Sequence, residues 1–98
     1  MYDRYILQDG KPIVSHDLIA WSSWLETADR TVARDTIGES KVSTVFLGLD
    51  HQFGSGPPLL FETMVFGGPL DGEQEHYSTR QQALAGHAEM LRKVREQP

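Results

Sequence analysis

The residue types best suited to binding or catalysis gather in one glycine- and proline-rich stretch, residues 50–58, which reads Asp-His-Gln-Phe-Gly-Ser-Gly-Pro-Pro. Gly54 and Gly56 allow backbone amides to approach a ligand closely, as in anion-binding nests. Phe53 offers a ring on which a base can stack, while His51 and Ser55 offer hydrogen-bond donors. We therefore predict that this loop binds a small anionic ligand such as a nucleotide. The structural alternative is an ordered turn whose exit is fixed by the two prolines.

Four further residues complete the predicted ligand site: Asp50, Glu62, Arg34 and Trp24. Glu62 stands alone among large apolar residues, so its carboxylate needs a cation, and Arg30 or Arg34 is expected to supply it. Trp24 lies on the flank of a predicted apolar helix face. It is either a core residue or an anchor for a ligand or partner, because tryptophan is favoured at binding hot spots.

An enzymatic alternative rests on Asp50, His51 and Glu62, which would serve a small hydrolase or a metal enzyme. Adjacent residues on a strand point to opposite faces, so Asp50 and His51 form a dyad only if the strand has already ended. The four histidines lack metal-ligand spacing and there is no cysteine. We favour a non-enzymatic protein with no catalytic residue, metal or cofactor. His87, on an apolar helix stripe, is expected to be a core histidine bonded to backbone or to Tyr77.

Two runs of β-branched and aromatic residues, 42–49 and 59–66, flank the loop and are predicted to be the central strands of a sheet. A hairpin is expected across the Asp-Gly turn at 9–10, and further strands at 31–37 and 76–77. Apolar residues at helical spacing predict one helix opening at 15–17 and another whose capping box spans residues 78–81 and begins at Ser78. We predict an α+β fold of order ββ-α-βββ-α, with an antiparallel sheet of about five strands and both helices on one face.

Length and composition limit the classes of function. The 98 residues are the size of one domain, and we expect residues 1–98 to form it. The net charge of −5 and the scattered lysines and arginines disfavour direct nucleic-acid binding. No run approaches the roughly 18 apolar residues of a membrane helix, so neither membrane insertion nor export is expected. A small core favours a homo-oligomer.

Several motifs together resemble a known family: Ala20-Trp21 with Trp24, Asp29-Arg30, Val32-Ala33, residues 42–51 (VSTVFLGLDH), residues 57–68 (PPLLFETMVFGG), Tyr77-Ser78-Thr79 and Ala85-Gly86-His87. With them, the chain resembles a family of small uncharacterised proteins of bacteriophages and bacterial genomes. The resemblance covers most of the chain and carries over no catalytic residue, cofactor or partner. It implies a phage or prophage setting, in the cytoplasm of a bacterial host, where small acidic proteins modulate host machinery or defences.

The leading hypothesis is a non-enzymatic phage-type protein that captures and sequesters a small anionic ligand, such as a nucleotide signal, across a subunit boundary. The alternative is a protein-interaction module that inhibits a host protein through an exposed apolar sheet face. The small hydrolase or metal enzyme comes third.

Overall fold

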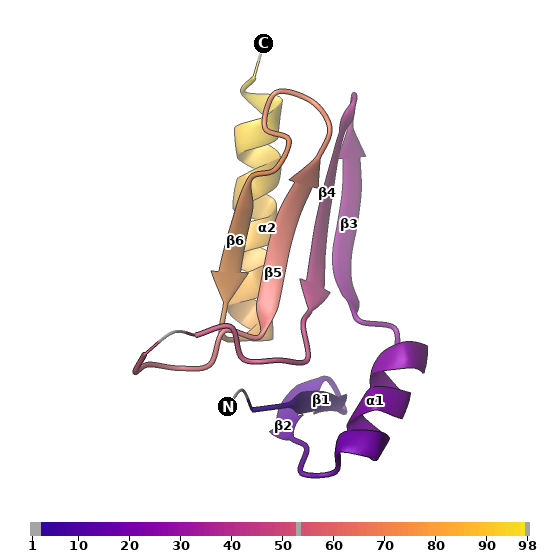
Figure 1. The fold of residues 1–98 in the computed structure, drawn as a ribbon. Coiled ribbons are helices and arrows are strands. Elements are labelled where there is room, and N and C mark those ends of the chain that lie inside the picture. The colour runs from indigo at the N-terminus through magenta and orange to yellow at the C-terminus, as the bar shows by residue number, and fades with distance from the viewer. Residues whose placement is uncertain (1–2, 53, 98) are drawn as a thin grey trace.

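The computed structural model describes residues 3–52 and 54–97 and consists of two helices and two antiparallel sheets. In chain order (Figure 1) the elements are β1 (Tyr5–Gln8), β2 (Lys11–Val14), α1 (Leu18–Thr27), β3 (Thr31–Ile37), β4 (Ser40–Phe46), β5 (Phe61–Phe66), β6 (Gln74–Tyr77) and α2 (Arg80–Arg95). The predicted α+β class with antiparallel strands is confirmed.

The strands divide between a four-stranded sheet, ordered β3-β4-β5-β6, and the separate hairpin β1-β2, whereas we had predicted a single sheet of about five strands. The reason lies after Phe46, where β4 ends earlier than its apolar run. Gly48 there has a φ of +81°, which favours glycine, and the chain turns out of the sheet. An isolated bridge between Arg4 and Leu49 links the hairpin to this segment.

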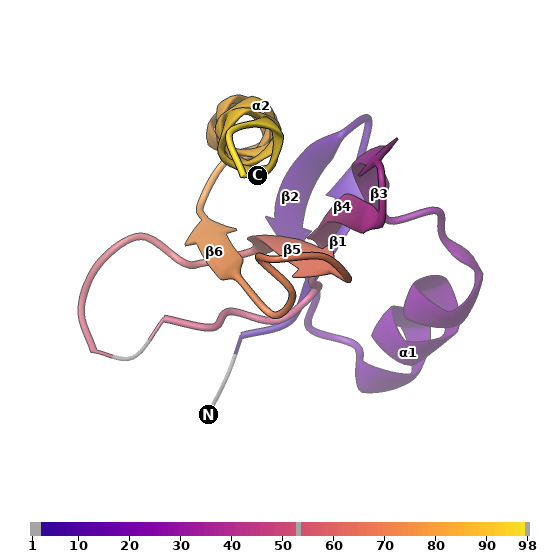
Figure 2. The ribbon, with the colours of Figure 1, turned by 90° about the horizontal axis from the view of Figure 1, so that it is seen from above.

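Helix α2 covers one face of the four-stranded sheet (Figure 2), because both elements have an apolar side. Alternate residues of β4 and β5 point to the helix, among them the fully buried Val42, Phe46, Phe61 and Val65. The facing stripe of α2 follows helical spacing and consists of Ala83, His87, Met90 and Val94. This layer holds the core.

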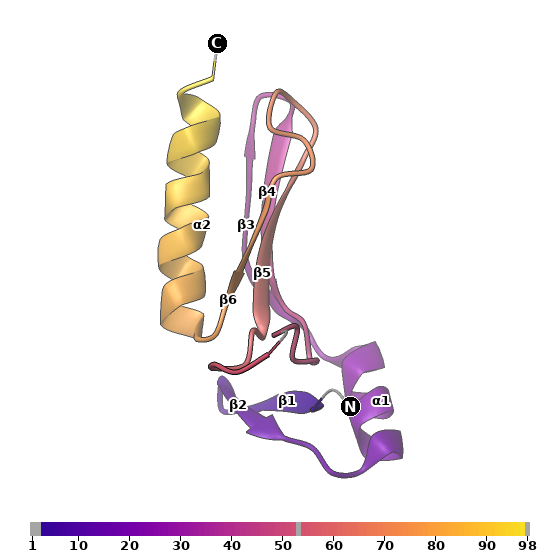
Figure 3. The same cartoon turned by 60° about the vertical axis from the view of Figure 1, so that its left-hand side comes forward.

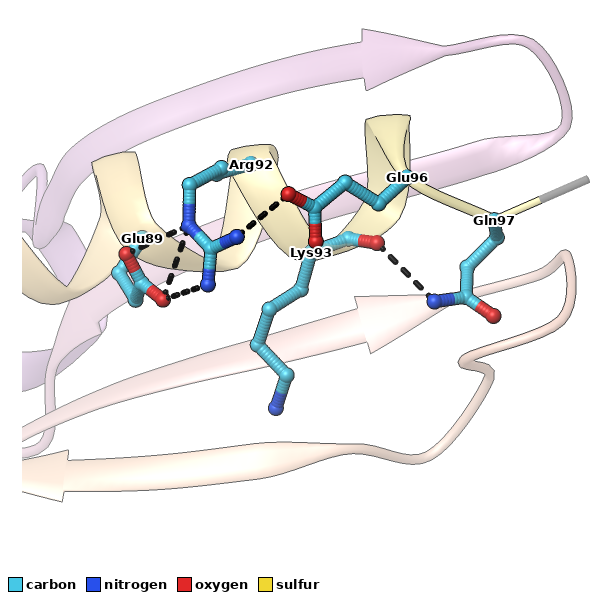
Figure 4. Close-up of polar contacts among 5 residues, drawn as sticks. All are labelled: Glu89, Arg92, Lys93, Glu96 and Gln97. Atoms are coloured by element: carbon cyan, nitrogen blue, oxygen red, sulfur yellow. Dashed lines mark hydrogen bonds and ion pairs between the residues drawn. The ribbon is translucent and has the colours of Figure 1, made fainter.

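Helix α2 is well capped. Thr79 and Gln82 form a capping box, one residue later than the predicted start at Ser78. At the other end Arg92 pairs with Glu89 and Glu96 (Figure 4). The hydrogen bond from Arg92 lowers the pKa of the Glu89 carboxyl. Because these ion pairs are exposed, they add little to stability.

Helix α1 is the exception to the predicted arrangement of both helices on one face. Asp17 caps it by accepting hydrogen bonds from Ile19 N and Ala20 N, at 3.0 and 3.1 Å. The helix packs against β1 and lies at the base of the molecule, on the side of the sheet opposite α2 (Figure 3). Trp21 fixes it there, since its Nε1 donates to the backbone oxygens of Tyr5 and Gly48.

Within residues 3–52 and 54–97, no helix runs along the sheet face turned away from α2 (Figure 3). We call it the open face; by strand register it presents Thr31, Arg34, Thr36, Lys41, Ser43, Val45, Glu62, Met64, Phe66, Gln74 and His76. Among the described residues, no helix is long and apolar enough to cross a membrane.

Candidate functional site

The loop at residues 50–58 is held closed at its base by Asp50. The Oδ1 atom of Asp50 accepts hydrogen bonds from Gln52 N at 2.8 Å and Leu59 N at 2.9 Å. Beyond this closure Gly54, Ser55 and Gly56 are exposed, and the two glycines have φ of +97° and +139°. Phe53, the predicted stacking ring, lies outside the described residues. The Asp50 carboxylate therefore orders the loop.

Glu62 finds its partner across the sheet, but the partner is neither Arg30 nor Arg34, and that prediction was wrong. The register of β5 and β6 sets Glu62 opposite His76, and Glu62 Oε2 lies 2.9 Å from His76 Nε2. The ring of His51 stacks on that of His76, with centroids 5.8 Å apart and planes at 20°. Three residues at one end of the open face thus form a carboxylate–imidazole–imidazole cluster.

This cluster offers proton donors and acceptors rather than a metal centre. The described residues contain no group of three or more histidine and acidic side chains that could hold a metal ion. Carboxylates also surround the loop base. Burial, then the charges of Asp3 and Asp50, raise the pKa of the Tyr5 phenol. Negative charge near Asp50 and Glu62 weighs against anion binding at this end.

A second polar chain crosses the core beneath α2. Thr63 Oγ1 lies 2.5 Å from Thr44 Oγ1, which in turn lies 2.7 Å from His87 Nδ1. His87 Nε2 lies 2.8 Å from Asp35 Oδ2 on β3. His87 is therefore a core histidine, as predicted, although Thr44 and Asp35 replace the backbone or Tyr77 as its partners.

The order hydroxyl, imidazole, carboxylate matches the components of a nucleophile relay. A nucleophile must reach its substrate, however, and Thr44 is 0% exposed under α2. Each member instead satisfies another polar group that burial has removed from water. Tyr77 lies next to Thr63 at the end of this hydrogen-bonded series. Burial raises the pKa of the Tyr77 phenol, the hydrogen bond with Thr63 lowers that pKa in part, and the charge of Glu75 raises it further. The network stabilises the core.

A shallow concave surface with a cation lies where α1 meets the open face. One cavity of about 450 Å³ is lined by Trp21, Ser22, Leu25, Glu26 and Arg30. A second, of about 260 Å³, is lined by Ala28, Asp29, Arg30, Thr31 and Val45. Arg30 lines both, and we call this pair of cavities the corner.

Arg30 is held at the corner by its neighbours on β4. Its Nη1 donates to the backbone oxygen of Phe46 at 3.1 Å, and its own backbone oxygen accepts from Phe46 N at 2.8 Å. A guanidinium has five N–H donors, so it retains donors for a ligand after this bond. Trp21, also at the corner, carries the guanidinium of Arg4 over its ring, 5.6 Å from the centroid.

The two remaining predicted site residues lie apart from the loop. Trp24 is half-buried and packs edge-on against Phe46, with ring centroids 5.8 Å apart. Of the two predicted alternatives, core residue or binding anchor, this contact favours the core residue. Arg34 is exposed on β3, opposite Ser43. The sequence reasoning missed Arg30, Arg4 and His76 as site residues. Only the strand register and the position of α1 bring them to the surfaces described above.

Three comparisons with known proteins were made: a scan against protein-family models, a search of curated proteins and a search of solved structures. None of them found a match.

Proposed function

We propose that this protein is a non-enzymatic binding protein that captures a small anionic ligand at the corner between α1 and the open face. The observation that carries the proposal is Arg30, a half-buried cation that lines both cavities. The larger cavity, about 450 Å³, falls within the range of about 300–1,000 Å³ typical of small-molecule sites.

The chemistry of the corner fits a nucleotide. Arg30 supplies donors for a phosphate, and Arg4 lies beside the same tryptophan ring. Trp21 supplies an aromatic surface, held in place by its two indole hydrogen bonds. Glu26 supplies an acceptor for the amino and imino groups of a base. A simple anion would gain nothing from Glu26, whereas a nucleotide can contact Arg30, Trp21 and Glu26 together.

The proposal includes the setting that the family resemblance implies: a phage-type accessory protein in the cytoplasm of a bacterial host that sequesters a nucleotide signal and so modulates host defence. The ligand site is thereby moved from the predicted loop, whose base carries Asp50 and lies near Glu62, to the corner at the same end of the open face. Binding is favoured over catalysis because the hydroxyl–imidazole–carboxylate series found among the described residues has its hydroxyl, Thr44, sealed beneath α2.

The test is calorimetric titration with ATP, cyclic AMP and a cyclic dinucleotide. Arg30→Gln should weaken binding of the best probe about 10- to 100-fold, because a hydrogen bond to a charged group contributes about 1.5–3 kcal/mol. Arg34→Gln removes the same charge from an exposed site on β3 and is the matched control; it should bind as the wild type does. Arg30→Lys keeps the charge but loses the planar fork, and we expect an intermediate affinity.

Absence of binding to all three probes, or equal losses in Arg30→Gln and Arg34→Gln, would contradict a nucleotide site at the corner. Thermal unfolding of each variant shows whether the fold survives, since Arg30 also donates to Phe46.

A second candidate, the protein-interaction module that inhibits a host protein, is favoured by one observation. Phe66 is 48% exposed on the open face beside the half-buried Met64, and the half-buried Val45 lies toward the other end of the same face. An apolar sheet face of this kind is a typical docking surface.

A further inference from the structure

We propose that the open face is the contact surface of a homodimer, in which two copies pack face to face with their strands antiparallel. The inference is independent of the ligand. It starts from the composition of the face: Val45 on β4 and Met64 and Phe66 on β5 form a diagonal apolar row that runs from the Glu62 end of the face to the Lys41 end. Charged and polar residues flank this row on all four strands. An apolar surface with polar residues around it is the organisation of protein interfaces.

The charges on the face select a second copy as the occupant. Lys41 lies at one end, where it pairs in register with Phe66 and places its Nζ 5.9 Å from that ring. Glu62 lies at the other end, in register with Val45. A two-fold axis between the sheets, nearly perpendicular to the strands, lays each end over the opposite end. Each strand then lies over the same strand of the other copy, so Lys41 on β4 of one copy lies one strand, about 4.8 Å, to the side of Glu62 on β5 of the other, twice per dimer.

The shape of the molecule selects the same orientation. Helix α1 projects from the base on the open-face side, so the sheet and α1 form two sides of an angle (Figure 3). In the antiparallel arrangement the far end of each sheet reaches the corner of the other copy. This far end comprises the turns at residues 38–39 and 67–73. It carries the exposed acidic residues Glu39, Asp71 and Glu73, and the corner it meets is lined by Arg30.

An estimate of area shows why the corner is needed. Strands lie about 4.8 Å apart and rise about 3.4 Å per residue. A face of four strands, each six residues long, therefore has a projected area of about 400 Å². A stable interface buries about 800 Å² per partner. The open face alone falls short of this value, and the additional contact of each far end with the partner's corner supplies a second patch. Two sheets packed in this way stay within about 30° of alignment.

The test is sedimentation equilibrium of the full chain over a wide range of concentration. The wild type should dimerise. Phe66→Glu should shift it to monomer, raising the dissociation constant at least tenfold. Leu84→Glu is the matched control, because Leu84 is 45% exposed on α2, away from the open face, against 48% for Phe66. It should leave the dimer intact.

Charge reversal tests the orientation. Lys41→Glu and Glu62→Lys should each weaken the dimer, and the double variant should restore it, because the two charges again oppose each other across the axis. Circular dichroism and melting curves establish that each variant folds, which matters most for Glu62→Lys because Glu62 pairs with His76. A monomeric wild type, or a dimer that responds equally to Phe66→Glu and Leu84→Glu, would overturn the proposal. If the wild type dimerises but the double variant does not regain the affinity of the dimer, the antiparallel orientation of the two copies is wrong. All of these measurements are made without ligand, so their outcomes do not depend on whether Arg30 binds a nucleotide.

Discussion

At the scale of single residues, the most demanding positions are the polar groups inside the core. Thr44 and Thr63 are both 0% exposed and His87 is 4% exposed. Burial of such groups is tolerated only because each finds a partner, and the described residues contain no buried side-chain nitrogen or oxygen without one. The network also fixes the register of α2 on the sheet, since His87 must meet Thr44 and Asp35 at once.

Thr44→Val tests this network with a change that preserves shape. It leaves His87 Nδ1 and the Thr63 hydroxyl without their shared partner, and an unsatisfied buried polar group costs about 1–3 kcal/mol. We expect that loss in the free energy of unfolding, measured by urea denaturation. Thr36→Val makes the same substitution at an exposed position of β3 and should change stability by about 0.5 kcal/mol or less. Similar effects in the two variants would show that the network contributes nothing.

At the scale of elements, α2 and β6 are joined by a contact that leaves no room for a side chain. Gly86 faces Tyr77, and a Cβ built on Gly86 would collide with the Tyr77 ring and its hydroxyl. Glycine within a helix is destabilising by about 1 kcal/mol relative to alanine, so its presence in the middle of α2 needs a reason. Close packing of the helix against the edge strand provides one.

Gly86→Ala should therefore destabilise the protein despite its better helix propensity. Overpacking costs about 1–3 kcal/mol, which exceeds the gain of about 1 kcal/mol. Repeating the change in a Tyr77→Ala background removes the collision and should reverse the sign, so that alanine at position 86 becomes stabilising. A double-mutant cycle from urea denaturation measures the difference. An unchanged sign in both backgrounds would mean that the contact with Tyr77 does not explain this glycine.

The elements that could be predicted from the sequence are those with strong local patterns. The two central strands follow from their runs of β-branched and aromatic residues, and α2 follows from its apolar stripe and capping residues. The position of α1 could not be predicted, because an apolar stripe shows that a helix is covered without showing by which surface. Most of its residues are exposed and none is buried, so its sequence pattern says little about which surface covers it.

The partners within the candidate sites could not be predicted for a related reason. Glu62 meets His76 only because β5 and β6 pair in one register, which the turn at residues 67–73 sets. Arg30 reaches the corner only because α1 turns away from α2. Residue types indicated which side chains need partners, as for Glu62 and His87, whereas the identity of each partner depends on contacts far apart in the sequence.

At the scale of the whole molecule, the proposed ligand site and the proposed dimer contact overlap. In the proposed antiparallel dimer, the acidic far end of one copy approaches Arg30 of the other, and a nucleotide phosphate would compete for that guanidinium. Two equilibria that share a group are linked reciprocally: whatever the ligand does to the dimer, the dimer does to ligand affinity by the same factor. The expected sign is negative, since carboxylates and phosphate exclude each other.

Phe66→Glu, which lies outside the corner, separates the two equilibria. As a monomer it should bind the best nucleotide probe about fivefold or more tightly than the wild type at a protein concentration where the wild type is dimeric, because allosteric coupling energies of about 1–3 kcal/mol are typical. The converse measurement is sedimentation of the wild type with saturating nucleotide, which should lower the dimer fraction. Leu84→Glu should behave as the wild type in both. If Phe66→Glu and the wild type bind the probe equally while the wild type remains dimeric with nucleotide present, the far end does not occupy the corner and the two sites act independently.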